Sequence, residues 1–294
     1  MIFDPTTLSA QQLYHYLSSS VAPRPICLAS TIDTQGRVNL SPFSFFNVFS
    51  SNPPIMIFSP VRRGRDNTIK HTLENIGEIR EVVINLVNYD MVEQMSLSSA
   101  EFSKDTNEFI KSGFTELESE RVQPPRVAEA PVAFECSVDQ VISLGDEGGA
   151  GNLILAKVVM IHIQDHLLDP EQRLDSSGLD LVARMGGNWY CRAKGEALFE
   201  VAKPNTTVGI GVDALPESVR NSRILTGNDL GKLGGISQLP EAADFKNISG
   251  STQVMHIQKT HARDSEAYDE AMHFLAREWL LQGKTKEALA LVLL

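Results

Sequence analysis

The chain has 294 residues, of which 42% are hydrophobic and 21% charged, a balance typical of a globular protein with a sizeable core. Its formal net charge of -11 argues against a general nucleic-acid partner, because neutralising phosphates requires clustered Lys and Arg. Three widely spaced cysteines, Cys27, Cys136 and Cys191, show no metal-ligand spacing, so no metal site is predicted and a reducing cytoplasm is favoured.

Neither a secretory signal nor a membrane-spanning segment is predicted. The first residues, MIFDPTTLSAQQLYHYL, lack a basic region followed by an apolar one. No apolar run approaches the length that spans a bilayer. We therefore expect a cytoplasmic protein without a membrane partner.

The first quarter of the chain predicts a helix and then strands. Apolar residues at helical spacing predict a helix over 9–18. Residues 26–41 predict a β-hairpin with a turn at 33–36, and 55–58 predict a further strand. A helix over 68–77 follows an arginine-rich loop, and we expect its cap to be Asp66, Asn67 or Thr68.

The middle of the chain is rich in predicted strands. A buried strand is predicted over 81–87, and longer ones over 133–142 and 152–163, with helices over 90–100 and 105–112. Five or more strands with few helices between them favour an antiparallel barrel over a parallel βαβ sheet.

The composition changes from Pro204 onward, where short helical patterns replace strands. Helical patterns cover 215–225 and 228–233, whereas 239–247 is polar. An amphipathic helix over 264–282, starting at Asp264 or Ser265, and a last helix over 284–294 end the chain. We therefore predict two domains, a β-rich one over 1–200 and a largely helical extension over 201–294.

The loop before the predicted helix at 68–77 suits a phosphate. Its arginines, Arg62, Arg63 and Arg65, precede a helix start, where unpaired N–H groups and partial positive charge favour an anion. An exposed cationic loop with an ordinary helix cap explains the same residues equally well.

The segment Ser41-Pro42-Phe43-Ser44 suits a flat ring. Hydroxyls and backbone amides could bond to the ring edge, while apolar side chains pack on its faces. For the aromatic residues that follow we expect a core position instead; these are Phe45, Phe46 and Phe49.

Other catalytic motifs are missing from the sequence. There is no GxGxxG, no P-loop and no GxSxG elbow. His162 stands alone in an apolar strand, and such a residue is more often structural than catalytic. We therefore predict no catalytic side chain.

Several short motifs occur in order along residues 15–195. They are Pro23-Arg24-Pro25-Ile26, Asn39 to Ser44, Asn52-Pro53-Pro54, Arg65-Asp66-Asn67-Thr68, Asn85-Leu86-Val87, and Arg184-Met185-Gly186-Gly187 with Tyr190. Together they resemble the flavin reductase-like family of FMN-binding split β-barrels. The region beyond them is similar to a C-terminal extension carried by a flavoredoxin-like subset of these proteins.

This resemblance implies an antiparallel split β-barrel that binds FMN at a homodimer interface. Family members often carry Lys-Asp-Thr or Arg-x-Thr at the start of the helix, so Arg63 or Arg65 would reach the phosphate. The implied cofactor-binding residues are Ser30 and Thr31 near the ring, Ser41, Pro42, Phe43 and Ser44 along the ring and ribityl chain, Ser59, Arg63, Arg65, Asn67 and Thr68 at the phosphate, and Arg184.

The leading functional hypothesis is an FMN-dependent oxidoreductase that takes hydride from NADH or NADPH and passes electrons to an unidentified acceptor. In such a protein the flavin performs the chemistry and the chain positions it. The first alternative is an FMN-binding electron carrier that does not react with NAD(P)H. The second is a scaffold that binds a partner protein and no flavin.

Overall fold

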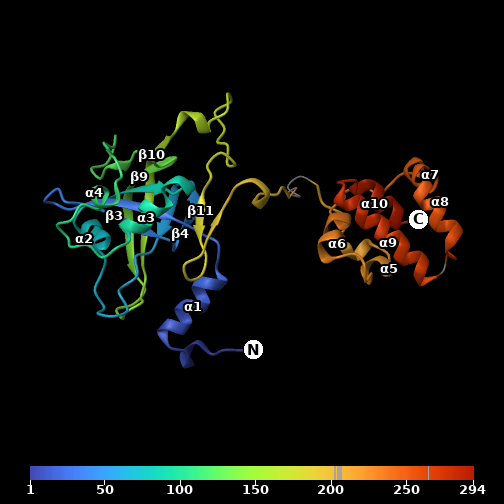
Figure 1. Ribbon diagram of the computed structural model, residues 1–294, viewed down its shortest axis with the longest axis horizontal. Coiled ribbons are helices and arrows are strands. Elements are labelled where there is room, and N and C mark those ends of the chain that lie inside the picture. Colours follow the sequence, from blue (N-terminus) through green and yellow to red (C-terminus); the bar gives the residue numbers. More distant parts are fainter. Residues whose placement is uncertain (202, 204–206, 264) are drawn as a thin grey trace. The chain divides into compact units, whose positions relative to one another are not determined.

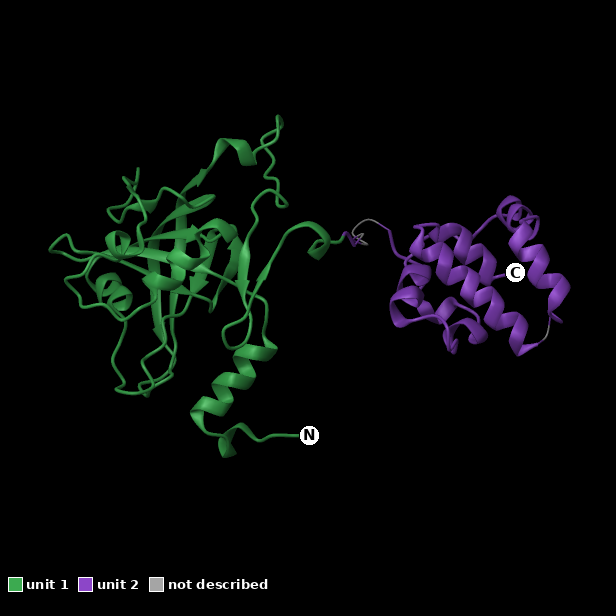
Figure 2. Cartoon of the chain, viewed as in Figure 1, with its two compact units in different colours: residues 1–199 green, residues 200–294 purple. Residues whose placement is uncertain are grey.

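The computed structural model describes residues 1–201, 203, 207–263 and 265–294. The chain divides into two compact units, Met1–Phe199 (unit 1) and Glu200–Leu294 (unit 2), which Figure 2 colours separately. Pro204 and Asp264, which entered the predictions above, lie outside the described residues. Among the described residues, no helix is both long and apolar enough to cross a membrane.

Unit 1 is built on a seven-stranded sheet with the order β3-β2-β6-β9-β10-β5-β4, in which all neighbours are antiparallel. A three-stranded sheet, β1-β11-β12, accompanies it (Figure 1). The strands of the large sheet are β2 (Cys27–Ile32), β3 (Val38–Phe43), β4 (Phe46–Ser51), β5 (Pro54–Phe58), β6 (Glu81–Leu86), β9 (Val132–Ser143) and β10 (Asn152–Ile163).

The remaining elements of unit 1 are short. The strands outside the large sheet are β1 (Arg24–Pro25), β7 (Glu116–Leu117), β8 (Arg126–Val127), β11 (Val182–Arg184) and β12 (Tyr190–Arg192). The α-helices are α1 (Ala10–Ser20), α2 (His71–Glu78), α3 (Val92–Ser98) and α4 (Glu108–Ser112). Single 3-10 turns are η1 (Pro5–Thr7), η2 (Tyr89–Met91), η3 (Asp165–Leu167) and η4 (Gly195–Ala197).

The strand alternation divides the apolar side chains of unit 1 between the two faces of the sheet. On one face of the sheet, Phe58, Ile84 and Cys136 form a hydrophobic cluster together with Ile76 of α2. Leu28 and Leu40 point the other way and pack with Phe109 of α4. The sheet is thus buried on both faces, which places α2 on one and α3 with α4 on the other.

Most predicted strands of unit 1 are confirmed. The hairpin predicted over 26–41 is the β2–β3 pair, with Cys27 opposite Phe43 and Ile32 opposite Val38. The long strands predicted over 133–142 and 152–163 are β9 and β10. One strand of the large sheet was missed, β4, because its sequence was interpreted as ring-binding and core residues, and the short strands outside that sheet were not predicted either. The predicted fold class, a mainly antiparallel β-barrel with helices, is confirmed.

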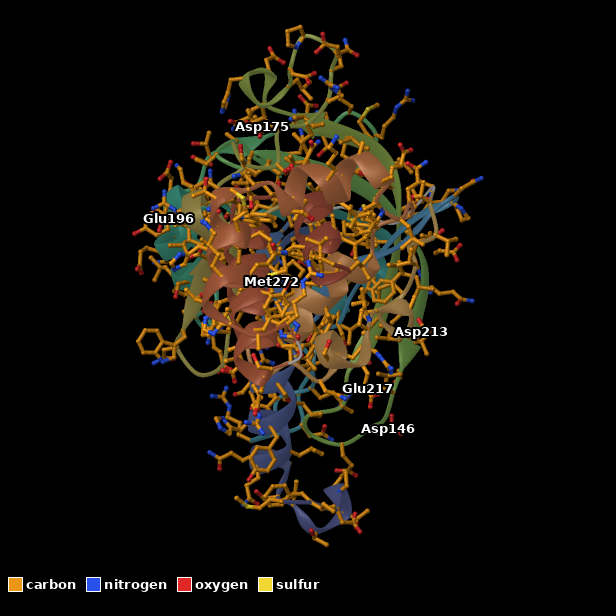
Figure 3. All side chains as sticks on the ribbon, turned by 90° about the vertical axis from the view of Figure 1, so that its right-hand side faces the viewer. Asp146, Asp175, Glu196, Asp213, Glu217 and Met272 are labelled. Atoms are coloured by element: carbon orange, nitrogen blue, oxygen red, sulfur yellow. The ribbon has the colours of Figure 1, made fainter. Side chains whose placement is uncertain are left out.

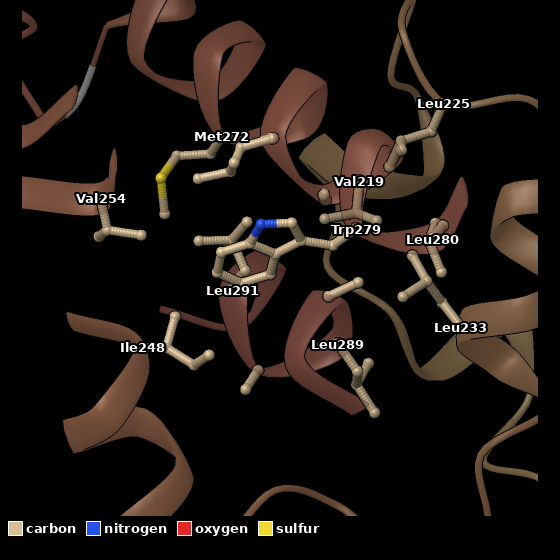
Figure 4. Packing of buried hydrophobic residues seen from close by; sticks show 14 of the residues in the cluster. Val219, Leu225, Leu233, Ile248, Val254, Met272, Trp279, Leu280, Leu289 and Leu291 are labelled. Carbon is tan, nitrogen blue, oxygen red and sulfur yellow. The ribbon is translucent and has the colours of Figure 1, made fainter. Parts of the chain in front are cut away.

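Unit 2 is helical, with η5 (Val212–Ala214), α5 (Glu217–Arg220), α6 (Gly227–Gly234), α7 (Ala242–Ser249), α8 (Thr252–Thr260), α9 (Glu266–Leu281) and α10 (Thr285–Val292). Its core surrounds Trp279 of α9, whose ring packs among Val254, Met272 and Leu291 (Figure 4). The polar stretch at 239–247, for which no helix was predicted, contains most of α7, which a capping box of Glu241 and Asp244 starts.

The amphipathic helix predicted over 264–282 is α9. Ser265 is its N-cap, with its hydroxyl accepting a hydrogen bond from the N–H of Tyr268. Acidic side chains are exposed in both units, as for Asp146 and Asp175 in unit 1 and Asp213 in unit 2 (Figure 3). Their exposure agrees with the net charge of -11.

Candidate functional site

A polar hollow opens beside the start of α2. Three basic side chains face it, Arg63, Lys70 and His71. The first turn of α2, β3, the end of α3 with the segment after it, and the start of α4 complete the lining, through Asn39, Ser41, Thr72, Ser98, Ser99, Ala100, Glu101, Phe102 and Glu108. The hollow therefore joins part of the predicted ring segment, Ser41, with part of the predicted phosphate loop, Arg63.

The helix at this hollow starts later than predicted. Asp66 does not cap α2, because its carboxylate accepts bonds from the N–H (3.0 Å) and hydroxyl (2.6 Å) of Thr68 and so closes a turn. Asn67 adopts a left-handed conformation, with φ of 58°. The chain then continues to Lys70, the N-cap, which makes no side-chain capping bond. The predicted cap at Asp66, Asn67 or Thr68 was wrong.

This shift changes which residues stand at the helix start. The first turn now offers Lys70, His71 and Thr72, and the N–H groups of His71 and Thr72 have no acceptor within the helix. Lys70-His71-Thr72 is neither of the two patterns implied by the resemblance, Lys-Asp-Thr and Arg-x-Thr, but it likewise places a cation two residues before a threonine at the helix start. The sequence analysis missed Lys70 and His71 because it placed the helix start at Thr68.

Arg63 is fixed within the loop. Its Nη1 donates to the hydroxyl of Thr68 (2.9 Å) and the carbonyl of Ile69 (2.6 Å), and its Nε donates to Glu101 (3.3 Å). The side chain is 15% exposed, whereas that of Arg65 is 67% exposed. The sequence left open whether Arg63 or Arg65 would reach the phosphate. Of these two arginines, only Arg63 lines the hollow.

The loop around Arg63 is held by the tip of the β9–β10 hairpin. The N–H of Arg62 donates to the carbonyl of Ala150 (2.9 Å), and the amide of Asn67 donates to the carbonyl of Asp146 (2.8 Å). Arg62 in turn donates to the side chain and the backbone carbonyl of Asn67. Asn67, predicted at the phosphate, thus has its side chain engaged within the loop.

Burial shifts the pKa of three groups at the hollow. Desolvation lowers the pKa of Lys70, nearby Arg63 and Arg65 lower it further, and Glu101 opposes the shift. Desolvation also lowers the pKa of His71, so this ring is neutral near pH 7 and can donate one hydrogen bond. Glu108 is buried, and desolvation raises the pKa of its carboxyl although the N–H of Leu40 donates to it.

A second polar layer lies beneath the hollow. The Asn39 amide donates to the hydroxyl of Thr72 (2.9 Å), and the Asn75 amide donates to that of Thr31 (3.3 Å). These bonds tie α2 to the β2–β3 hairpin. Thr31, predicted near the ring, is fully buried here and supports the helix.

The other predicted ring residues occupy different surroundings. Ser41 and Pro42 are half-buried on β3, while Phe43 is a core residue whose ring centroid lies 5.3 Å from that of Phe58. Ser30 is fully buried, and its hydroxyl has no hydrogen-bond partner among the described residues. Ser59, at the end of β5, is also buried and accepts from the N–H of Asn152.

Ser44 lies at a junction organised by Arg24. The buried guanidinium of Arg24 donates to Ser44 (3.4 Å), to the carbonyl of Val21 at the end of α1 and to that of Met185 after β11. Desolvation lowers the pKa of Arg24 below its ordinary value. Arg24 therefore links Ser44 to the segment that carries Arg184.

Arg184 and the aromatic residues complete the predicted set. The Arg184 guanidinium lies 4.7 Å from the centre of the Tyr190 ring and donates to the tyrosine oxygen and the Gly187 carbonyl. Phe46 packs against the core, but Phe45 and Phe49 are 37% and 64% exposed. The expected core position was therefore wrong for both: Phe49 lies on β4, an edge strand with one neighbour, and Phe45 lies just before that strand.

His162 has a structural partner. Its Nε2 lies 2.6 Å from the buried carboxylate of Glu135, which also accepts from the N–H groups of Glu120 and Arg121. The ring does not line the hollow. This placement agrees with the structural role expected from the sequence.

The side chains at the hollow fit a phosphate-bearing polyol. Two cations, Arg63 and Lys70, and the free N–H groups at the start of α2 suit a phosphate. The hydroxyls of Ser41, Ser98 and Ser99 suit a hydroxylated chain. The donor chemistry is that which a flavin mononucleotide needs at its ribityl phosphate.

The comparisons with known proteins address unit 1. The model of the family described as "Flavin reductase like domain" matches residues 19–178. An uncharacterised protein of Aquifex aeolicus is 35% identical over 189 residues, 64% of this chain and 94% of the relative. Another from Halalkalibacterium halodurans is 36% identical over 192 residues, 65% of this chain and 91% of the relative.

Solved structures show the same architecture. Nitrilotriacetate monooxygenase component B from Bacillus cereus is 28% identical with a TM-score of 0.64, over 68% of this chain and 98% of that one. The 2-nitrobenzoate 2-nitroreductase NbaA of Pseudomonas fluorescens is 27% identical with a TM-score of 0.61. The match covers 69% of this chain and 96% of that one.

The fold of unit 1 is that of the flavin reductase-like split β-barrels, and a helical C-terminal unit follows it. Because the family match covers more than half of the residues, this chain belongs to the flavin reductase-like family. Unit 2 lies outside the matched range.

Proposed function

We propose that the protein is an FMN-dependent oxidoreductase that takes hydride from NADH or NADPH and delivers electrons to a separate acceptor. The observation that carries the proposal is the cationic, hydroxyl-lined hollow at the start of α2 in a flavin reductase-like chain. Two solved relatives with related sequences bear the names of a monooxygenase component and a nitroreductase, which supports redox chemistry.

The chain's own residues would bind and orient the cofactor. Arg63, Lys70 and the first turn of α2 would hold the phosphate, while Ser41 would donate to the ribityl chain. Ser44, which lies outside the hollow beside Arg24, would donate to the ring edge. Bound FMN would supply the hydride and electron chemistry. Of the predicted binding residues, we assign supporting roles to Thr31, Ser59, Asn67 and Thr68, because none of them lines the hollow and each bonds to a neighbouring residue.

We also propose that the protein is a homodimer with the flavin at the interface. Exposed apolar side chains of unit 1 support this assembly, with Leu17 of α1 54%, Phe49 of β4 64% and Ile161 of β10 54% exposed. Size measurement of the FMN-loaded protein tests the dimer. A stable loaded monomer would contradict it.

The test of the activity is a visible absorbance spectrum followed by anaerobic titration with NADH and then NADPH. A flavin spectrum that bleaches supports the oxidoreductase and identifies its reductant. A flavin that stays oxidised would instead indicate an electron carrier that receives electrons from another protein. A protein that neither contains nor takes up FMN would overturn the flavin assignment.

A further inference from the structure

A carboxylate already occupies the cationic edge of the hollow. Glu101 accepts from Nε of Arg63 at 3.3 Å with one oxygen and from Nη2 of Arg65 with the other. It is the carboxylate that bridges these two arginines, and its charge also acts on Lys70. Glu108, the other acid of the hollow, instead accepts from the backbone N–H of Leu40.

Arg63 is held more firmly by its neighbours than Glu101 is. Arg63 is fixed by its bonds to Thr68 and Ile69, so its Nε edge keeps facing the hollow without Glu101. Glu101 lies between α3 and α4, in a stretch with neither helix nor strand, and its side chain is 40% exposed. Glu101 can therefore leave the arginines without breaking an element.

We propose that Glu101 is an internal competitor for the ligand phosphate, so that a ligand with a phosphomonoester must displace this carboxylate from Arg63 and Arg65 to bind. The inference rests on the proposed function, because it assumes that Arg63 receives the phosphate of FMN. A phosphomonoester brings up to two negative charges and three acceptor oxygens, so it can displace a single carboxylate from the arginines. A flavin without phosphate, such as riboflavin, leaves Glu101 in place.

The experiment compares FMN and riboflavin binding to the full chain and to Glu101→Gln by fluorescence titration. Glutamine keeps the shape of the side chain but removes the charge that competes with the phosphate. We expect Glu101→Gln to bind FMN roughly two- to fivefold more tightly, the range set by loss of an exposed ion pair, and riboflavin with unchanged affinity. Added inorganic phosphate should also inhibit FMN binding more strongly in this variant.

Asp105→Asn is the matched control. Asp105 lies in the same segment and bonds to Arg37 at 2.8 Å, away from the hollow, so its loss removes one charge and one ion pair without touching Arg63. Its affinities for both flavins should equal those of the unaltered protein. An equal gain in FMN affinity in Asp105→Asn would attribute the effect to net charge and overturn the proposal.

The other outcomes separate this inference from the proposed function. If the unaltered protein prefers FMN to riboflavin but Glu101→Gln binds FMN equally or more weakly, the competitor role is wrong while the flavin site stands. If the unaltered protein binds FMN and riboflavin alike, or binds neither, the phosphate site itself is wrong and both proposals fall.

Discussion

Arg63 and Arg65 are two residues apart, yet their surroundings give them different roles. Arg63 is mostly buried and faces the hollow, while Arg65 is 67% exposed and bonds to Asp66 and Glu101. A buried arginine loses less to competing water when it binds a phosphate. We predict that Arg63→Gln weakens FMN binding by about tenfold or more, and Arg65→Gln by about threefold or less.

Titration of both variants with FMN and riboflavin measures this difference. Riboflavin has no phosphate, so its affinity should change little in either variant. Equal losses of FMN affinity in the two variants would mean that both arginines contact the phosphate, contrary to the placement of Arg65 outside the hollow.

Glu135 is a second residue whose surroundings determine its role, because they set the pKa of its carboxyl. It is fully buried, and burial alone would raise the pKa of its carboxyl. Hydrogen bonds from the Glu120 N–H, from His162 and from the Arg121 N–H outweigh burial and lower this pKa below the ordinary value of 4.5. The carboxylate thereby anchors the loop at 119–123 to the sheet.

We predict that Glu135→Gln lowers the free energy of unfolding by about 2 kcal/mol at neutral pH, because a glutamine cannot accept from all these donors. A group with a lowered pKa in the folded state stabilises the fold above its unfolded pKa. The stabilisation is then lost as the pH falls below 4.5 and through the folded pKa. The difference between the variant and the unaltered protein should therefore shrink below this pH.

Urea unfolding at a series of pH values measures the effect. Glu81→Gln is a control in the same region, because Glu81 accepts a single bond, from the Gln123 N–H, which glutamine can replace. Parallel stability curves for Glu135→Gln and the unaltered protein across this range would show that Glu135 is not an ionised acceptor.

At the scale of the element, α2 shows a conflict between stability and binding. Its N-cap is Lys70, which makes no capping bond, although a serine there would accept from the free N–H groups of the first turn. We predict that Lys70→Ser raises the free energy of unfolding by about 1 kcal/mol and weakens FMN binding several-fold, because the cation is lost.

Lys70→Gln separates the two effects. Glutamine removes the charge but is a poor N-cap, so affinity should fall without a gain in stability. Urea unfolding of the flavin-free protein and FMN titration give the two readouts. Unchanged FMN affinity in both variants would show that the phosphate does not approach the start of α2.

Helix α2 also shows which features could be predicted from the sequence and which could not. The apolar face of α2 was visible in Ile69, Leu73 and Ile76, but its start was not. Asp66 and Thr68 are good caps in isolation, and the sequence does not reveal that they bond to each other. The hairpin β2–β3 was predictable because both its turn and its alternation are local.

The hollow could be predicted only in part, because tertiary contacts form it. Ser41 and Arg63 were identified from their own segments. Ser98 and Glu101 come from a segment about forty residues further along, and no local pattern connects them with Arg63. The exposure of Phe49 was missed for a similar reason, since strand order determines which strand is at the edge.

At the scale of the whole molecule, each unit has its own hydrophobic core. The cluster around Trp279 consists entirely of residues from unit 2, whereas the clusters around Phe58 and Phe109 consist of residues from unit 1. A unit with a separate core can unfold separately. We predict that the full chain unfolds in two thermal transitions.

Substitution of one buried residue in each unit would show which transition belongs to which unit. Ile84→Ala in β6 and Leu289→Ala in α10 each remove a fully buried side chain, at a cost of about 3 kcal/mol. Each should lower one transition by several degrees and leave the other in place. In a Trp189→Phe background, the fluorescence of Trp279 should follow only the transition that Leu289→Ala shifts. A single transition that both variants lower together would show that the two cores are energetically coupled, and then the helical unit would contribute to the stability of the flavin site.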